Sequence, residues 1–199
     1  MPDLIPDNSN KIAYALGYIF HPFVLGVVGI AAVLSQEKLT FSEAASWLIT
    51  LSLILIVPLV SMIQYLKRQE KYTYQRHSRT PFYLTGWLAM LTCMGLVIWR
   101  DLPQLAACFA SLLLWVPLQV IINRTWTKVS AHSAVSVGFT LGLGWLGIIH
   151  TPWLYAGAAA LVLLTAWARI MTRNHTLIQV VLGWIVAALS ILLTFPLFL

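Results

Sequence analysis

Residues 44–66 read AASWLITLSLILIVPLVSMIQYL, a stretch of 23 residues without one charged side chain. About 20 consecutive apolar residues are enough for an α-helix to cross the hydrocarbon core of a bilayer. The apolar residues follow one another directly, without the alternation of a half-buried strand or a heptad pattern. This stretch therefore predicts a membrane-crossing α-helix and sets the class of the fold.

Six further apolar blocks occur along the chain, separated by short polar interruptions. The 199 residues are 60% hydrophobic and 9% charged, whereas soluble domains carry roughly 25% charged residues. We predict an all-α fold: one polytopic transmembrane helical bundle over residues 1–199, with six to seven spans and short loops. We expect a multi-pass integral membrane protein of a prokaryotic plasma membrane. The candidate spans are residues 13–34, 44–66, 82–99, 104–122, 132–149, 152–170 and 177–198.

Seven crossings place alternate loops on opposite sides of the membrane. Ten of the twelve Lys and Arg residues then share one side, which we call the basic side, and only Lys38 and Arg100 lie opposite. The positive-inside rule would turn the basic side to the cytosol. The polar segments of that side, which hold the motifs discussed below, lie at about 67–81, 123–132 and 169–179.

The acidic residues limit the chemistry. All six lie outside the predicted spans, so we expect no carboxylate-bridged metal site, and we predict neither a metal nor another cofactor. Cys93 and Cys108 lack metal-ligand spacing and are interpreted as packing residues. The net charge of +6 sits at helix ends, which favours phosphate or anionic lipid over nucleic acid. The predicted partners are the bilayer and a membrane lipid phosphate.

Handling a phosphate ester without a metal requires three kinds of group. Cationic donors must neutralise the phosphoryl oxygens, a nucleophile must attack phosphorus, and an acid must protonate the leaving alkoxide. Arginine and lysine suit the first task, and a neutral and a protonated histidine suit the other two. The basic side offers every one of these residue types.

Two motifs on the basic side carry these residues. Arg169, His175 and Gln179 form the pattern Arg-x5-His-x3-Gln, and residues 128–132 read Lys-Val-Ser-Ala-His. They resemble the third and second signatures of the type-2 phosphatidic acid phosphatase superfamily, Ser-Arg-x5-His-x3-Asp and Pro-Ser-Gly-His. The resemblance implies that His175 attacks phosphorus to form a phosphohistidine and that His132 protonates the leaving lipid alcohol. It also implies a metal-independent hydrolase of lipid phosphomonoesters or diphosphates.

The first signature of that superfamily, Lys-x6-Arg-Pro, is echoed by Lys71 and Arg79, with Thr80 between Arg79 and Pro81. Arg76 is an alternative to Arg79 in this role. The resemblance extends over about residues 67–185, most of the chain. The residues that it implies as phosphate ligands are Lys71, Arg76 or Arg79, Lys128, Ser130 and Arg169.

Gln179 stands where the superfamily has an aspartate. Residues four apart meet on one face of a helix, so Gln179 is placed to accept the imidazole N–H of His175 through its carbonyl oxygen. It lacks the negative charge that would stabilise an imidazolium. We therefore expect a slower but competent nucleophile, with Gln179 as a catalytic residue. The alternative is a non-catalytic lipid-phosphate binder or carrier that retains the basic pocket.

The resemblance and the charge distribution differ over orientation. Many members of the superfamily act on the extracytoplasmic leaflet, whereas six basic residues remain on the basic side after the presumed ligands Lys71, Arg79, Lys128 and Arg169 are set aside. The charge distribution favours a site that faces the cytosol.

Overall fold

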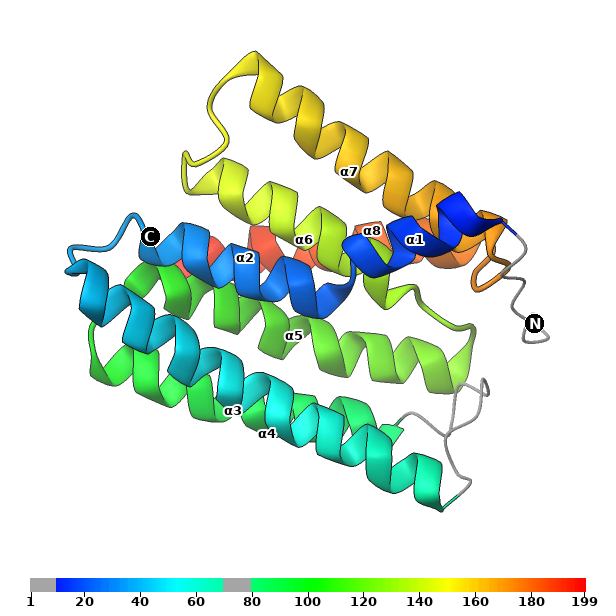
Figure 1. The fold of residues 1–199 in the computed structure, drawn as a ribbon, viewed down its shortest axis with the longest axis horizontal. Coiled ribbons are helices and arrows are strands. Elements are labelled where there is room, and N and C mark those ends of the chain that lie inside the picture. The colour runs from blue at the N-terminus through cyan, green and yellow to red at the C-terminus, as the bar shows by residue number, and fades with distance from the viewer. Residues whose placement is uncertain (1–9, 70–79) are drawn as a thin grey trace.

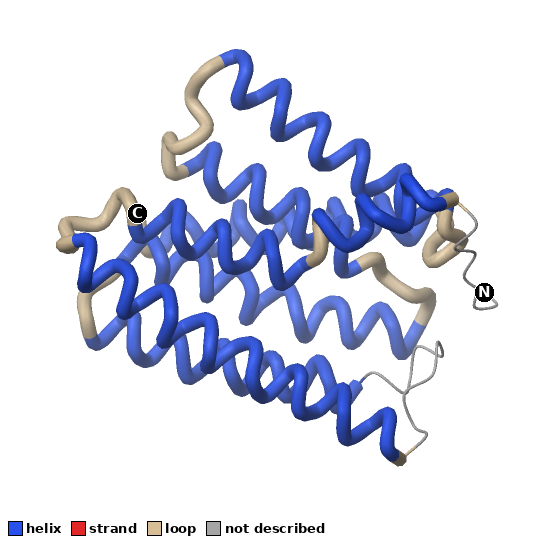
Figure 2. Tube along the Cα trace, viewed as in Figure 1, coloured by secondary structure: helices blue, strands red, loops and turns tan. Residues whose placement is uncertain are grey.

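The structure is a computed structural model that describes residues 10–69 and 80–199. Within these ranges it consists of α-helices and one short 3₁₀ turn, without strands, which confirms the all-α prediction (Figure 2). The elements are α1 (Lys11–Ile19), α2 (Pro22–Leu34), α3 (Phe41–Arg68), α4 (Thr80–Trp99), α5 (Pro103–Thr125), α6 (Ala131–Trp145), α7 (Pro152–Met171), α8 (Leu177–Thr194) and η2 (Phe195–Leu197).

Six helical segments in the described residues are long and apolar enough to cross a membrane, with α1 and α2 taken together. The prediction of a polytopic membrane bundle is confirmed. α6 is not among the six, because its 15 residues extend only about 22 Å, less than the ~30 Å of a hydrocarbon core. The predicted span 132–149 is thus too long: the helix ends at Trp145, and Gly147 turns the chain with a φ of 71°.

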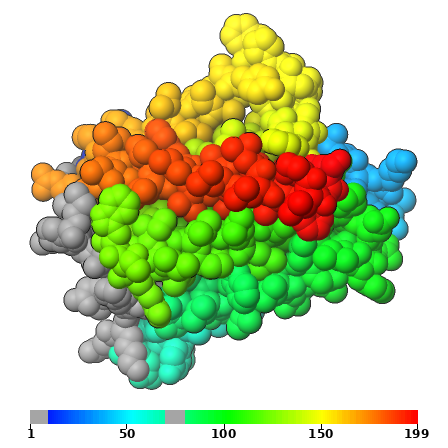
Figure 3. All heavy atoms as spheres, turned by 180° about the vertical axis from the view of Figure 1, so that it is seen from behind, coloured from blue at the N-terminus to red at the C-terminus, as the bar shows by residue number. Residues whose placement is uncertain are grey.

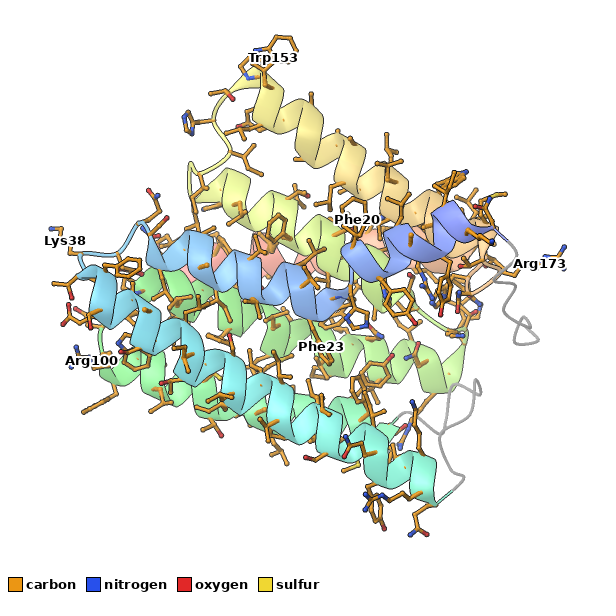
Figure 4. The ribbon with its side chains drawn as sticks, in the orientation of Figure 1. Phe20, Phe23, Lys38, Arg100, Trp153 and Arg173 are labelled. Atoms are coloured by element: carbon orange, nitrogen blue, oxygen red, sulfur yellow. The ribbon has the colours of Figure 1, made fainter. Side chains whose placement is uncertain are left out.

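The helices run between two ends of one bundle (Figure 1). The start of α1 and the connections after α5 and α7 lie at one end, and the C-terminus lies at the other together with the connections after α2, α4 and α6. Lys38 and Arg100 lie at the end opposite Arg173, as the sequence predicts (Figure 4). The short α6 still connects the two ends, because the chain after α5 turns back into the bundle before α6 begins.

The first predicted span, 13–34, is broken into two helices. Pro22 has no N–H to donate and disfavours helical backbone at the preceding residue, so α1 ends before it and α2 begins with it. His21 is extended, with φ −65° and ψ 140°, and caps α2. Phe20 and Phe23 flank this break (Figure 4). As a result α1 packs on α7, whereas α2 packs on α6 and α3.

α8 lies across the back of the bundle, with α5 on one side and α6 and α7 on the other (Figure 3). α8 approaches α6 closely at Gly183, where an added Cβ would lie 2.7 Å from the backbone oxygen of Ser130 and 3.2 Å from the nitrogen of Ala134. Gly142 similarly admits the ring of Phe195, at 3.4 Å. Gly183 thus lets the beginning of α6 pack against α8, directly beside the second sequence motif, and Gly142 does the same near the end of α6.

Candidate functional site

A cavity of about 310 Å³ opens among α2–α6 and the ends of α7 and α8. Four of the residues that line it bear nitrogen groups suited to an anion: His21, His132, Arg169 and His175. Much of the remaining lining is apolar and comes from α2, α3, α4 and α5. The cavity therefore joins a cluster of cationic and imidazole groups to an apolar interior.

His175 precedes α8, and its ring is fixed by Gln179. The imidazole Nδ1 lies 3.1 Å from Gln179 Oε1, which confirms the predicted pairing of the two side chains. The backbone N–H of Thr176 also donates to Gln179 Oε1, at 3.2 Å, as part of a capping box at the start of α8. A backbone N–H needs an acceptor, so the amide oxygen of Gln179 must face this way. Nδ1 of His175 then carries the proton, and Nε2 keeps the lone pair.

Gln179 also forms hydrogen bonds with the segment that bears the second motif. Its Nε2 donates to Thr127 Oγ1 at 3.1 Å, and its backbone oxygen accepts the N–H of Ser130 at 3.1 Å. Because Thr127 is separated from it by 52 positions, these bonds bring the two motifs together across the bundle. One residue thus orients His175 and positions the start of α6.

The segment from Thr127 to Ser130 is buried, although it lies outside any helix. Its backbone is satisfied locally: the N–H of Val129 donates to Asn123 Oδ1 at 2.7 Å. Lys128 Nζ donates to the backbone oxygen of Asn174 at 3.4 Å, next to His175. This contact places a positive charge near the imidazole.

Ser130 has a local role in the structure. Its Oγ accepts the N–H of Ser133 as the N-cap of α6, at 3.4 Å, and lies 2.9 Å from Ser133 Oγ. Ser130 is fully buried and does not line the cavity. The expected role of its hydroxyl as a phosphate ligand stays a prediction, whereas its role in starting the helix that carries His132 is evident.

The spacing between Arg169 and His175 follows from a tight turn. The backbone oxygen of Arg169 accepts the N–H groups of Asn174 and His175, at 3.1 and 3.2 Å. Arg173 makes the reversal with a φ of 51°. The guanidinium of Arg169 approaches α1 at Gly17, where an added Cβ would lie 3.4 Å from Nη1. The five intervening residues therefore bring the arginine and the histidine to one cavity.

Burial lowers the pKa of the His175 imidazole well below 6.5, and the charges of Lys128 and Arg169, followed by that of His132, lower it further. The hydrogen bond to Gln179 acts in the opposite direction and is outweighed. His175 is therefore neutral at physiological pH, as a nitrogen nucleophile must be.

Lys71, Arg76 and Arg79, the residues expected from the first signature, lie outside the described residues. The structure adds His21, which sequence reasoning missed. Its ring packs edge-on against that of His132, with centroids 5.1 Å apart. The signal for it is a His-Pro pair inside an apolar span, which marks a helix break at membrane depth.

Comparison with known proteins adds no further evidence. No protein-family model, curated protein or solved structure matches the chain. In the described residues no three His, Cys, Asp or Glu side chains gather in a way that could hold a metal ion. The geometry of the cavity therefore carries the argument for function.

Proposed function

We propose that the protein is a metal-independent integral membrane lipid phosphatase that acts through a phosphohistidine intermediate. Its substrate would be a lipid phosphomonoester or diphosphate such as phosphatidate, phosphatidylglycerophosphate or an isoprenyl phosphate or diphosphate. The observation that carries the proposal is the state of His175: Nδ1 is held by Gln179, the ring is neutral, and cationic groups surround it in a cavity.

In the first step of the proposed reaction, Nε2 of His175 attacks phosphorus and forms a P–N bond. The P–O bond to the lipid breaks, and His132 gives its proton to the leaving alkoxide. Arg169 stabilises the charge that develops on the phosphoryl oxygens, and Lys128 adds positive potential near the ring. In this proposal each group has a role that suits its chemistry.

In the second step water attacks the phosphohistidine. His132, now neutral, takes a proton from that water, the P–N bond breaks and inorganic phosphate leaves. Nε2 of His175 recovers its lone pair while Gln179 holds Nδ1–H throughout. The cycle returns both histidines to their starting states and consumes one water.

The apolar part of the cavity supports a lipid as the phosphate donor. Leu55 and Leu59 from α3, Met90 from α4 and Leu112 from α5 are part of its lining. Such a surface favours an acyl or prenyl chain through burial of apolar area. A water-soluble phosphate ester would leave this part of the cavity unused.

The membrane and the orientation are also proposals. We place the protein in a prokaryotic plasma membrane with the basic side towards the cytosol, because the lysines and arginines are concentrated there. In Lys67→Cys protein, a membrane-impermeant thiol reagent should then label that end only from the cytosolic side. Labelling of intact cells from outside would reverse the orientation.

The second candidate function is a non-catalytic lipid-phosphate binder. Gln179 favours it, because an amide cannot stabilise the imidazolium as a carboxylate would, while the cationic cavity could still hold a phosphate.

Phosphate release distinguishes the two functions. We expect purified protein in detergent with EDTA to release phosphate from at least one lipid in a panel of phosphatidate, phosphatidylglycerophosphate and isoprenyl mono- and diphosphates. A short water-soluble phosphomonoester serves as the control and should be a poor substrate. Folded protein that binds these lipids but releases no phosphate would overturn the phosphatase and establish the binder.

The pH dependence of turnover tests the state of His175. Because its pKa is held well below 6.5, the acid limb of kcat/KM should lie below pH 6.5. In Gln179→Glu protein a carboxylate of the same length faces Nδ1–H, favours the imidazolium and raises the pKa of His175. The acid limb should therefore move to higher pH. Lys128→Met, which removes a nearby cation, should move it in the same direction. An acid limb unchanged in both variants would show that another group titrates.

A further inference from the structure

His21 has a defined place in the cavity that its position within an apolar span does not suggest. It caps α2 at the break after α1, is half-buried, and lines the same cavity as His132, Arg169 and His175. The mechanism proposed above makes no use of it. An imidazole at such a depth is costly unless it has partners or a task.

The capping bond determines where the proton of the neutral His21 ring lies. The backbone N–H of Phe23 donates to Nδ1 of His21, at 3.2 Å. Nδ1 must then offer its lone pair, so the hydrogen of the neutral ring is on Nε2. This is the reverse of His175, whose Nδ1 carries the proton. The cavity therefore contains one histidine prepared to attack and another prepared to donate a hydrogen bond.

Two neighbours of His21, His132 and Arg169, are residues of the candidate site. Its ring meets that of His132 edge-on, with an interplanar angle of 89° and centroids 5.1 Å apart. The guanidinium of Arg169 is close enough to interact with it electrostatically. A group that donates a hydrogen bond beside an arginine and the proposed general acid is suited to bind a phosphoryl oxygen.

We propose that His21 is an additional phosphate-binding residue, which donates from Nε2–H to a phosphoryl oxygen of the bound substrate. The inference rests on the proposed function for the class of ligand, a phosphate ester or phosphate-like oxyanion. His21 keeps its proton through the reaction and forms no covalent bond. It would supplement Arg169, which reaches the same cavity from a different helix, α7.

The test must distinguish the role of His21 as a hydrogen-bond donor from its role as the N-cap of α2. His21→Asn keeps an acceptor at the position of Nδ1, and asparagine is a favoured N-cap residue, but it has no group at the position of Nε2. His21→Gln instead reaches the position of Nε2 with an N–H and gives up the cap. We expect the asparagine variant to fold with an unchanged melting temperature and to lose about 10²-fold in kcat/KM, as for removal of one oxyanion donor. The glutamine variant should recover part of that loss.

Binding of orthovanadate provides the second measurement, because it needs no turnover. Vanadate should bind wild-type protein and bind His21→Asn at least tenfold more weakly. If His21→Asn matches the wild type in both vanadate affinity and kcat/KM, His21 is only a helix cap and the inference is wrong. If the wild type hydrolyses no lipid but the variant still binds vanadate more weakly, the phosphatase fails and the role of His21 as an anion ligand stands. A wild type that does not bind vanadate overturns the inference, whatever its turnover.

Discussion

Replacing His175 with alanine should lower phosphate release from the preferred lipid by about 10⁴- to 10⁶-fold, the range seen when single members of a catalytic triad are removed from an enzyme that acts through a covalent intermediate. No other described side chain is placed like it, with one ring nitrogen held by Gln179 and the other carrying a lone pair. The alanine variant keeps the capping box between Thr176 and Gln179, so the start of α8 should stay intact. The measurement is phosphate release in detergent, over a range of lipid concentrations.

The matched control is His150→Ala. His150 is exposed in the connection between α6 and α7, which lies at the end of the bundle opposite the connection after α7, and its Nδ1 lies 3.0 Å from the backbone oxygen of Ile148. Turnover of this variant should equal that of the wild type. Rapid quenching of wild-type protein with a ³²P-labelled lipid should also trap an acid-labile phosphoryl group that His175→Ala does not form. Retention of turnover by His175→Ala would refute the proposed nucleophile.

Gly183→Ala should destabilise the protein by about 1–3 kcal/mol, because overpacking at a tight contact forces the backbone to move. The added Cβ would lie 2.7 Å from the oxygen of Ser130, which is backbone and cannot rotate away. α6 would have to shift relative to α8, and His132 moves with α6. A displacement of about 1 Å in a catalytic group can cost about 10²-fold in turnover. Thermal unfolding in detergent and phosphate release give the two measurements.

Gly144→Ala is the control for that substitution. Gly144 lies in α6, and an added Cβ there meets no atom within 4 Å. Alanine is the better helix former, so this variant should be as stable as the wild type or slightly more stable. Equal stability and turnover in Gly183→Ala and Gly144→Ala would show that the contact between α8 and Ser130 does not constrain the site.

The sequence predicts the membrane bundle well because each crossing needs a long apolar block that hydropathy detects directly. It predicts the break after Phe20 poorly, since the hydropathy of residues 13–34 continues across His21 and Pro22. It also overestimates the fifth span, because Leu146–Ile149 are apolar but follow the end of α6 as a turn. Apolar character sets the membrane region, whereas helix ends depend on local backbone geometry.

At the site, sequence spacing predicts the contact of His175 with Gln179 correctly. The reason it gives, a shared face of one helix, is wrong. The two residues do not share a helical face, because His175 precedes the N-cap Thr176. The capping box between Thr176 and Gln179 instead holds Gln179 Oε1 where Nδ1 of His175 reaches it. Contacts between residues distant in sequence could not be predicted, such as that of Gln179 with Thr127 and that of His21 with His132. These pairs depend on how helices pack, which no local pattern encodes.

The interruption between α1 and α2 has a consequence for hydration. Non-helical backbone at membrane depth persists only where protein or water satisfies its polar groups, and here the break adjoins the cavity lined by His21. We therefore expect the part of the cavity around His21 to be wet, while its apolar lining stays available to the lipid chain. In the proposed reaction the lipid transfers its phosphoryl group to His175, and the phosphohistidine must then be accessible to water. Water in the cavity beside the broken helix would then be available to hydrolyse the phosphohistidine.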